Sequence, residues 1–186
     1  MEKIINDAHP SKLHILDQFY PPEDVLVFDI ETTGFTAEHT MLYLIGCAYY
    51  ESGRFKICQW FNQDGHSEKQ MLEEFFAFAS RYKYCITYNG DGFDIPYLSK
   101  KAQKYQLDNS ISKIESVDFY KQIRFLKDIL HLENMKQKSE ERFLGTNRLD
   151  KYSGGDLIKV YQDYLKLPVR TNKQLLLQHN YEDLEG

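Results

Sequence analysis

Short apolar runs of strong β propensity recur along the first two thirds of this chain. Three of them lie close together: "VLVFDI" (25–30), "MLYLIGCAYY" (41–50) and "RFKICQWF" (54–61). The "ESG" between the last two has the length of a hairpin turn, so these runs predict an antiparallel meander. "YCITY" (84–88) and "IESVDFY" (114–120) predict two further strands.

Apolar residues at helical spacing occupy the intervals that follow. Between 67 and 82 they recur three and four apart, and Ser67 and Gln70 have the spacing of a capping box. Further helices are expected at 93–105, from the fifth strand to about 131, over the short "SEERFLG" (139–145), and at 156–166. A last helix, capped by Thr171, carries the C-terminal "LLLQHNYEDLEG".

The order of these elements predicts the fold class. A meander followed by strand–helix–strand crossovers indicates an α/β fold with a mixed five-stranded sheet, antiparallel in its first three strands and parallel in the rest, flanked by helices. Residues 1–24 are expected to be an irregular or partly helical lead-in. The sequence shows no repeat, long linker or low-complexity run, which favours one domain over 25–186.

Composition narrows the class of protein. The chain has 186 residues, 42% apolar and 27% charged, which is typical of one soluble globular domain. No apolar run reaches the roughly 18 residues that argue a membrane span, and the start has no run of signal-peptide length. Cys47, Cys58 and Cys85 lie in apolar segments and are expected to be buried free thiols of a cytoplasmic protein.

The charge is unevenly distributed. The net charge of −5 is made up of −8 over residues 1–95, +4 over 96–151 and −1 over 152–186. Such a division is compatible with a metal site beside an anion-binding surface, although charge alone does not establish either.

Two acids end the first expected strand. Asp29 and Glu31 are two residues apart, so the period of a strand places both side chains on one face. Carboxylates that follow directly on apolar residues are costly unless a partner offsets their charge. A divalent cation with oxygen ligands is one such partner. The alternative is that the two acids pair with a lysine or an arginine, or cap a neighbouring turn.

The loop after the fourth expected strand adds a third acid. "YNGDGFDIPYL" (88–98) turns on two glycines and begins a helix with Phe93 and Asp94. Ligands of such sheets bind in the crevice at the strand ends, so Asp94 could approach the first pair. Asn89 could fix a backbone or a substrate hydroxyl, and Phe93 could wedge against a base or anchor the helix. Alternatively, the loop is an ordinary turn, and the negative charge of Asp94 interacts favourably with the dipole of the helix that it begins.

The last helix supplies a fourth acid. His179 and Asp183 are one helical turn apart and face the same side. Four acids converging on two cations form the arrangement that hydrolyses phosphodiesters, and a nearby side chain that titrates near neutrality suits the attacking water. A satisfied surface histidine, or a simple His–Asp helical pair, is the alternative.

In that order, "FDIETTG", "YNGDGFD" and "HNYED" resemble motifs I, II and III of the DEDD 3′–5′ exonucleases, which have the ribonuclease H-like fold. The central "EERFLGTNRLDKYSGGDLIKVYQDYL" is similar to the YprB-type predicted exonucleases, which resemble the proofreading domains of family B DNA polymerases. The resemblance covers roughly residues 25–186. It implies hydrolysis from the 3′ end of single-stranded DNA or RNA, with two ions of Mg²⁺ or Mn²⁺, releasing nucleoside monophosphates.

The resemblance also implies roles for individual residues. The implied metal ligands, which are also catalytic, are Asp29, Glu31, Asp94 and Asp183. The implied contacts to the nucleic acid are Thr32, Thr33 and Gly34 in the motif I loop, with Asn89 and Phe93 in motif II. Asp118 has a counterpart at the end of a strand and is expected to be structural.

Motif III departs from the family pattern. The tyrosine subgroup has Tyr-x3-Asp and the histidine subgroup has His-x4-Asp, whereas this chain has His179-x3-Asp183. Gln178 stands where the second subgroup has its histidine, and Tyr181 lies on another face of the helix. The departure leaves the catalytic, water-activating role of His179 open, but not the assignment of Asp183. The chain ends three residues later, and the sequence leaves open whether it is a piece of a longer protein.

Three functions are compatible with these residues. The first is a metal-dependent 3′–5′ exonuclease, the second a nucleic-acid-binding module with weak or no catalysis, and the third an endonuclease or resolvase on the same fold. Cations that could flank a groove for the strand, or form solvated helix faces, are Lys100, Lys101, Lys104, Lys121, Arg124 and Lys127. The sequence separates neither DNA from RNA nor one oligomeric state from another.

Overall fold

The computed structural model describes residues 1–8, 18–132, 134–146, 148–149 and 151–185. Its centre is a six-stranded mixed sheet in the order β1-β4-β3-β2-β5-β6. The strands are β1 (Glu2–Asp7), β2 (Val25–Thr32), β3 (Leu42–Glu51), β4 (Arg54–Phe61), β5 (Tyr84–Thr87) and β6 (Glu115–Asp118). The antiparallel meander and the parallel second half are confirmed, because β2 pairs antiparallel with β3 and parallel with β5.

One strand lies outside the expected five. Glu2–Asp7 forms β1, which pairs antiparallel with β4 along its whole length, so irregular or helical structure is the wrong expectation for these residues. β1 is an edge strand with mostly exposed side chains, and such a strand lacks the apolar run that marks a buried one. The rest of the expected lead-in includes residues 9–17, which lie outside the described residues.

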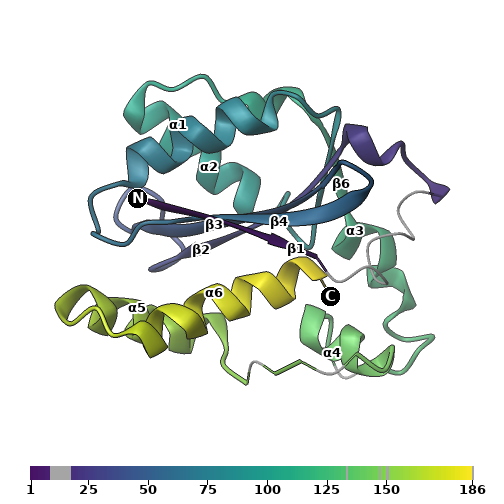
Figure 1. Cartoon of the computed structure of the whole chain (residues 1–186). Helices are drawn as coiled ribbons and strands as arrows, with labels where there is room; N and C mark the ends of the chain where they lie inside the picture. Colours follow the sequence, from purple (N-terminus) through teal and green to yellow (C-terminus); the bar gives the residue numbers. More distant parts are fainter. Residues whose placement is uncertain (9–17, 133, 147, 150, 186) are drawn as a thin grey trace.

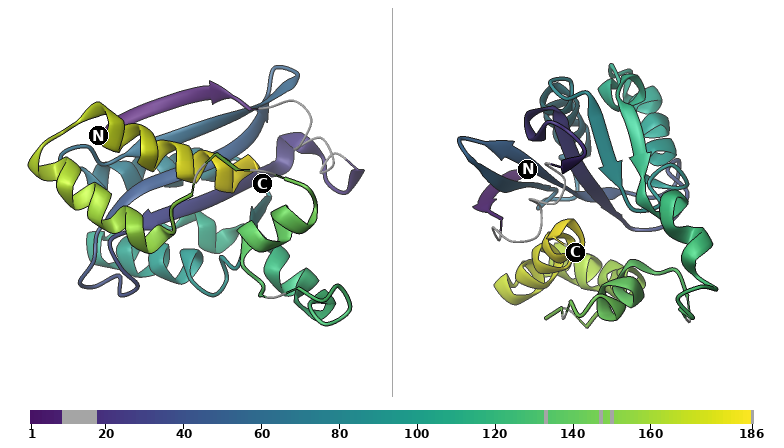
Figure 2. Two further views of the ribbon diagram at one scale, coloured as in Figure 1. Left: turned by 90° about the horizontal axis from the view of Figure 1, so that it is seen from below. Right: turned by 90° about the vertical axis from the view of Figure 1, so that its right-hand side faces the viewer.

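Helices cover both faces of the sheet (Figure 1). On one face lie α1 (Glu68–Ala79) and α2 (Asp94–Tyr105), and on the other lie α5 (Gly154–Lys166) and α6 (Arg170–Glu185). Figure 2 shows α5 and α6 side by side beneath the sheet. The segment between β6 and α5 contains α3 (Phe119–Ile123) and α4 (Gln137–Phe143), which extend the molecule beyond one end of the sheet.

The apolar core has two layers, one on each side of the sheet. Phe28, Trp60 and Phe75 belong to the layer between the sheet and α1 with α2. Tyr43 and Tyr161 stack in the layer beneath, with ring centroids 4.4 Å apart, and join the sheet to α5. Cys47, Cys58 and Cys85 are buried free thiols, as expected.

The expected ends of three helices need correction. Ser67 precedes α1 without capping it, because its hydroxyl donates to Asp64 instead. The helix expected up to about 131 ends at Ile123 and continues only as a 3-10 turn, Arg124–Leu126. Phe125 in that segment is 67% exposed, so little core packing is available to hold a longer helix. α6 begins at Arg170, which places Thr171 inside its first turn and not at a cap.

The hairpin between β3 and β4 lies at the end of the sheet that is remote from the C-terminal end of β2. Leu26, near the start of β2, pairs with Tyr49, whereas Thr32 at its end pairs with Leu42. The turn itself uses Ser52 and Gly53, both with positive φ (55° and 84°), which suits a two-residue connection. Every residue from Glu51 to Arg54 is exposed.

Candidate active site

The C-terminal half of β2 presents its acids to the face that α6 covers. Phe28 and Ile30 point into the apolar layer between the sheet and α1 with α2. Asp29 and Glu31 therefore point to the opposite face of the sheet, as the strand period predicts. Glu31 is 7% exposed. The Tyr43 hydroxyl donates to its Oε2 at 3.3 Å and holds one carboxylate oxygen in place.

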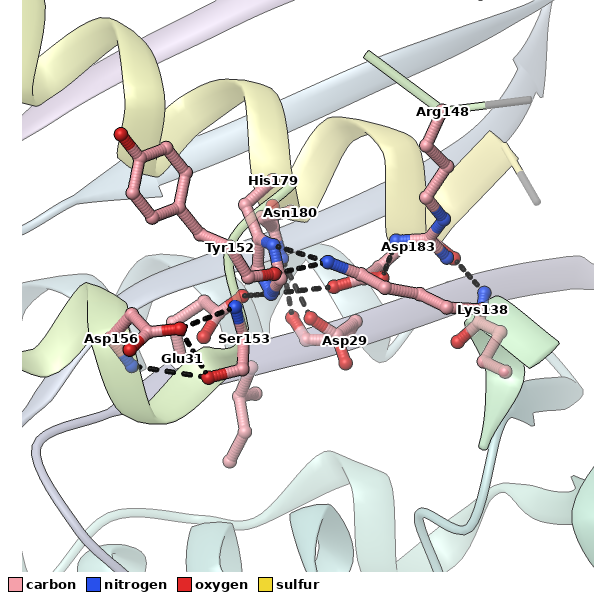
Figure 3. A network of polar contacts seen from close by, with 12 residues as sticks. Asp29, Glu31, Lys138, Arg148, Tyr152, Ser153, Asp156, His179, Asn180 and Asp183 are labelled. Carbon is pink, nitrogen blue, oxygen red and sulfur yellow. Dashed lines mark hydrogen bonds and ion pairs between the residues drawn. The ribbon is translucent and has the colours of Figure 1, made fainter. Parts of the chain in front are cut away.

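α6 brings His179 and Asp183 onto the same face (Figure 3). His179 is 5% exposed, and its Nε2 lies 3.5 Å from Glu31 Oε1 and 3.3 Å from Asp183 Oδ2. The ligand atoms of Glu31, His179 and Asp183 all lie within 4.8 Å of one another, which is a spacing that could hold a metal ion. The alternative of a histidine on an open helix surface therefore does not hold, since the ring is buried between carboxylates.

Asp94 reaches the site from the parallel side of the sheet. It is the first residue of α2, and its Oδ1 accepts a hydrogen bond from the backbone N–H of Ile30 at 3.2 Å. Ile30 lies between Asp29 and Glu31 in β2, so this bond places the third acid directly beside the first two. Loop 88–94 is held in turn by Asp118, which accepts from the backbone N–H groups of Asn89 and Asp91 at 2.9 and 3.2 Å.

Burial and neighbouring negative charges raise the pKa of three of these acids. Burial first, and then the negative charge of Asp183, raises the pKa of both Asp29 and Glu31 well above the ordinary range. Burial raises the pKa of Asp94 to about 7, and the negative charges of Asp118 and then of Asp183 add to the shift. Such a cluster resists full ionisation unless a cation joins it, and carboxylate oxygens are the ligands that Mg²⁺ and Mn²⁺ prefer.

Two cations of the segment between β6 and α5 also face the acids, and no sequence motif singled them out. The Arg148 guanidinium forms ion pairs with Glu141 and Asp183. Lys138 Nζ lies 3.4 Å from His179 Nδ1 and donates to the Tyr152 carbonyl (Figure 3). The net positive charge of residues 96–151 was a signal that this region meets an acidic surface, but it did not identify these two side chains.

The motif I loop is fixed by its own hydrogen bonds. Thr32 Oγ1 donates to the Gly34 carbonyl at 2.8 Å, and Thr33 Oγ1 accepts from the Met41 N–H at 2.9 Å. Gly34 has φ of 155°, and a Cβ there would lie 2.8 Å from Thr40 Cγ2. These three implied substrate contacts therefore lie in a loop that its own hydrogen bonds hold next to Glu31.

An aromatic pair lies at the rim of the site. Phe35 is 89% exposed, and its ring centroid lies 5.8 Å from that of Phe93 in an edge-to-face contact. Phe35 directly follows the motif I loop, and no motif in the sequence singled it out. Asn89 is exposed in the loop between β5 and α2, with a positive φ of 60°.

A model of the RNase_H superfamily matches residues 26–185. The chain belongs to the RNase_H superfamily. The expected ribonuclease H-like fold is thereby confirmed, with six strands in place of five.

Other proteins similar to this superfamily member are DNA polymerases. The DNA polymerase of Methanocaldococcus jannaschii is 36% identical over 47 residues, 25% of this chain and 3% of the relative. That of Pyrococcus glycovorans is 34% identical over 89 residues, 43% of this chain and 12% of the relative. The solved family B DNA polymerase from the archaeon Pyrobaculum calidifontis matches with a TM-score of 0.63 at 18% identity, over 90% of this chain and 24% of that chain. The chain thus spans only a small part of each, and the structural match establishes the fold alone.

Gln178 and Tyr181 on α6 point away from the acids of this RNase_H-superfamily chain. Gln178 is exposed and donates to Glu182 at 2.7 Å. The Tyr181 hydroxyl lies 2.9 Å from Glu185 Oε1 and 3.2 Å from the carbonyl oxygen of Asp7 on β1, so this tyrosine does not stand in for a catalytic one.

One of the expected surface lysines is buried. Lys101 is 0% exposed, and its Nζ bonds Glu68 Oε1 at 2.7 Å and the Thr40 carbonyl at 2.6 Å, so it cannot flank a groove. Lys100 and Lys104 do line a surface groove of about 390 Å³ with Glu38, beside the motif I loop. Of the other cation set, Lys121 lies in α3, Arg124 begins the 3-10 turn after it, and Lys127 directly follows that turn. None of the described helices is long and apolar enough to cross a membrane.

Proposed function

We propose that this protein is a metal-dependent 3′–5′ exonuclease that hydrolyses phosphodiester bonds at the 3′ end of single-stranded DNA or RNA. One observation carries the proposal: Asp29, Glu31, Asp94 and Asp183 come from three separate elements and lie near one another and near His179. Membership of the RNase_H superfamily and the partial similarity to DNA polymerases support a nucleic acid as substrate.

The donor set fits two ions of Mg²⁺ or Mn²⁺. All four acids offer hard oxygen ligands, and burial with mutual repulsion raises the pKa values of Asp29, Glu31 and Asp94, so added positive charge would be favourable. Bound there, the ions would supply a hydroxide at neutral pH and stabilise the leaving oxygen.

The side chains around the acids would bind and orient the strand. The exposed ring of Phe35, braced by Phe93, offers a stacking surface for a terminal base. Lys100 and Lys104 line the adjoining groove, where they could follow the phosphate backbone. Asn89, in the loop between β5 and α2, is exposed and could contact the sugar or a phosphate.

His179 is the side chain best placed to handle a proton. An ammonium only donates, so the contact from Lys138 requires Nδ1 of His179 to accept. The neutral ring then carries its proton on Nε2, which faces Glu31 and Asp183. In this tautomer Nε2 orients an oxygen ligand by donating to it. Accepting a proton from water requires the opposite tautomer, with Lys138 displaced.

A second function is favoured by the ion pair between Arg148 and Asp183. A guanidinium on one of the four acids reduces the negative charge available to cations. A nucleic-acid-binding module that keeps the fold with weak catalysis would have this property, and the same assay separates it from the exonuclease.

The decisive assay uses 5′-labelled single-stranded DNA and RNA oligonucleotides with Mg²⁺ or Mn²⁺. The expected result is a ladder that shortens from the 3′ end and disappears in EDTA and in Asp29→Ala. Asp108→Ala, which changes an exposed acid that pairs with Lys113, is the matched control and should cleave like wild type. Binding without cleavage would favour the second function. Cleavage of a circular single strand would instead indicate an endonuclease.

A further inference from the structure

Asn180, the residue after His179, bridges the sheet beneath α6. Its side chain is 0% exposed. Nδ2 donates to Oδ2 of Asp29 at 2.9 Å, and Oδ1 accepts from Nε2 of Gln59 at 2.9 Å (Figure 3 shows the contact with Asp29). The amide therefore connects a candidate metal ligand on β2 to a buried glutamine on β4, two strands away.

The register of the sheet explains how one amide spans three strands. Asp29 pairs with Gly46 on β3, and Gly46 pairs with Gln59 on β4, so these three residues form one row across the sheet. Asn180 lies over the middle of this row. A Cβ on Gly46 would stand 2.0 Å from Asn180 Oδ1, so the glycine provides the space in which the amide lies.

The network also fixes which way round the amide lies. Gln59 is 1% exposed, and its Nε2 donates both to Asn180 Oδ1 and to the Leu177 carbonyl, each at 2.9 Å. A flipped Asn180 would set two NH₂ groups against each other and an amide oxygen against the carboxylate of Asp29. Both contacts are repulsive, so only the observed orientation satisfies all partners.

We propose that Asn180 is a positioning residue that holds the Asp29 carboxylate in the orientation required for metal binding. The donated bond fixes Oδ2 and so the rotation of the carboxylate, and Gln59 fixes the donor. This inference rests on the proposed function, because it treats Asp29 as a ligand. Partners that orient ligands in this way typically contribute about 10- to 100-fold in metal affinity.

The competing explanation is that the amide merely fastens α6 to β4. Direct titration of the full chain with Mn²⁺, by calorimetry or by the electron paramagnetic resonance signal of the free ion, separates the two explanations. Asn62→Ala is the matched control: Asn62 is equally buried, and its amide bonds the Leu42 carbonyl and the Ser67 N–H. Circular dichroism and thermal unfolding monitor folding in every variant.

For a positioning role, Asn180→Ala should weaken Mn²⁺ binding by about 10- to 100-fold, and Gln59→Leu, which frees the amide to rotate, by less than Asn180→Ala. Asn62→Ala should lower the thermal midpoint without changing Mn²⁺ affinity. If Asn180→Ala fails to fold, the Mn²⁺ affinity of Gln59→Leu decides whether Asn180 has a positioning role.

These results test the positioning role of Asn180 separately from the exonuclease activity. Unchanged Mn²⁺ affinity in folded Asn180→Ala and Gln59→Leu would overturn the positioning role, even where wild type degrades nucleic acid. Reduced affinity in these variants would support it, even where wild type binds Mn²⁺ without cleaving. A wild-type protein that binds no Mn²⁺ would overturn both proposals.

Discussion

Removing the charge of Asp94 should stabilise the metal-free protein while it weakens metal binding. Asp94 is 6% exposed, and Asp94→Asn keeps its size and the Oδ1 that accepts from the Ile30 N–H. A folded-state pKa of about 7 against an ordinary 3.8 is a difference of about 3 units, which corresponds to a cost of about 4 kcal/mol at pH 8. The asparagine variant avoids that cost, because it carries no charge at any pH.

The sign of the pH dependence follows from the raised pKa. Between about pH 4 and pH 7 the folded protein holds a proton on Asp94 that the unfolded chain has lost. The free energy of unfolding of wild type should therefore fall as the pH rises through this window. The difference in the free energy of unfolding between Asp94→Asn and wild type should therefore shrink by about 3 kcal/mol from pH 8 to pH 5. About two of the three pKa units of the shift lie in that interval.

Urea unfolding in EDTA at pH 5 and pH 8 measures both effects. Asp118→Asn is the contrasting variant. The two oxygens of Asp118 accept from the backbone N–H groups of Asn89 and Asp91, so the amide loses one of these bonds. This variant should be less stable than wild type at pH 5, where the neighbouring Asp94 is protonated. With Mg²⁺ at 100 times its Kd, wild type should gain about 2.7 kcal/mol and Asp94→Asn much less. An Asp94→Asn protein that is no more stable than wild type at pH 8 in EDTA would refute the reasoning.

Three further changes test the neighbourhood of the site. His179→Ala should lower turnover far more than it lowers oligonucleotide binding, as measured by single-turnover rates and by fluorescence anisotropy; an unchanged rate would mean that this ring does not handle the proton. Lys101→Met should cost about 3–5 kcal/mol in the free energy of unfolding, because it leaves the buried Glu68 without its cation, and adding Glu68→Gln should recover most of that loss; similar instability of the single and double variants would contradict this. Gly46→Ala should push Asn180 and α6 away from the sheet and lower the free energy of unfolding by about 1–3 kcal/mol. The expected result is a lower thermal midpoint together with weaker Mn²⁺ binding. Wild-type values of both would show that the close approach is dispensable.

The period of the strand and of the helix was enough to predict which acids share a face. Asp29 and Glu31 alternate with Phe28 and Ile30, and that alternation alone places the two carboxylates together. The turn chemistry of loop 88–94 likewise predicted the start of α2, and with it the position of Asp94 at a strand end.

Contacts between distant segments could not be predicted in the same way. Asn180 is separated from Asp29 by 151 residues and from Gln59 by 121, and no local pattern records which strand a helix will cross. Lys101 looked like one of several helix-surface lysines, and only the packing of α2 against α1 shows that it is buried against Glu68. β1 was missed for a related reason, since an edge strand takes its stability from the neighbour it pairs with and not from its own side chains.

The positive-φ turn at Ser52 and Gly53 is a suitable site for attaching a label or a tether. It lies at the opposite end of the sheet from Thr32 and the motif I loop, and its residues are exposed. A fluorophore, an affinity peptide or a surface tether attached there would sit far from any strand of nucleic acid bound at the acids. Protein immobilised through this hairpin would face the solution with its candidate site outward, which suits single-molecule observation of a chain being shortened.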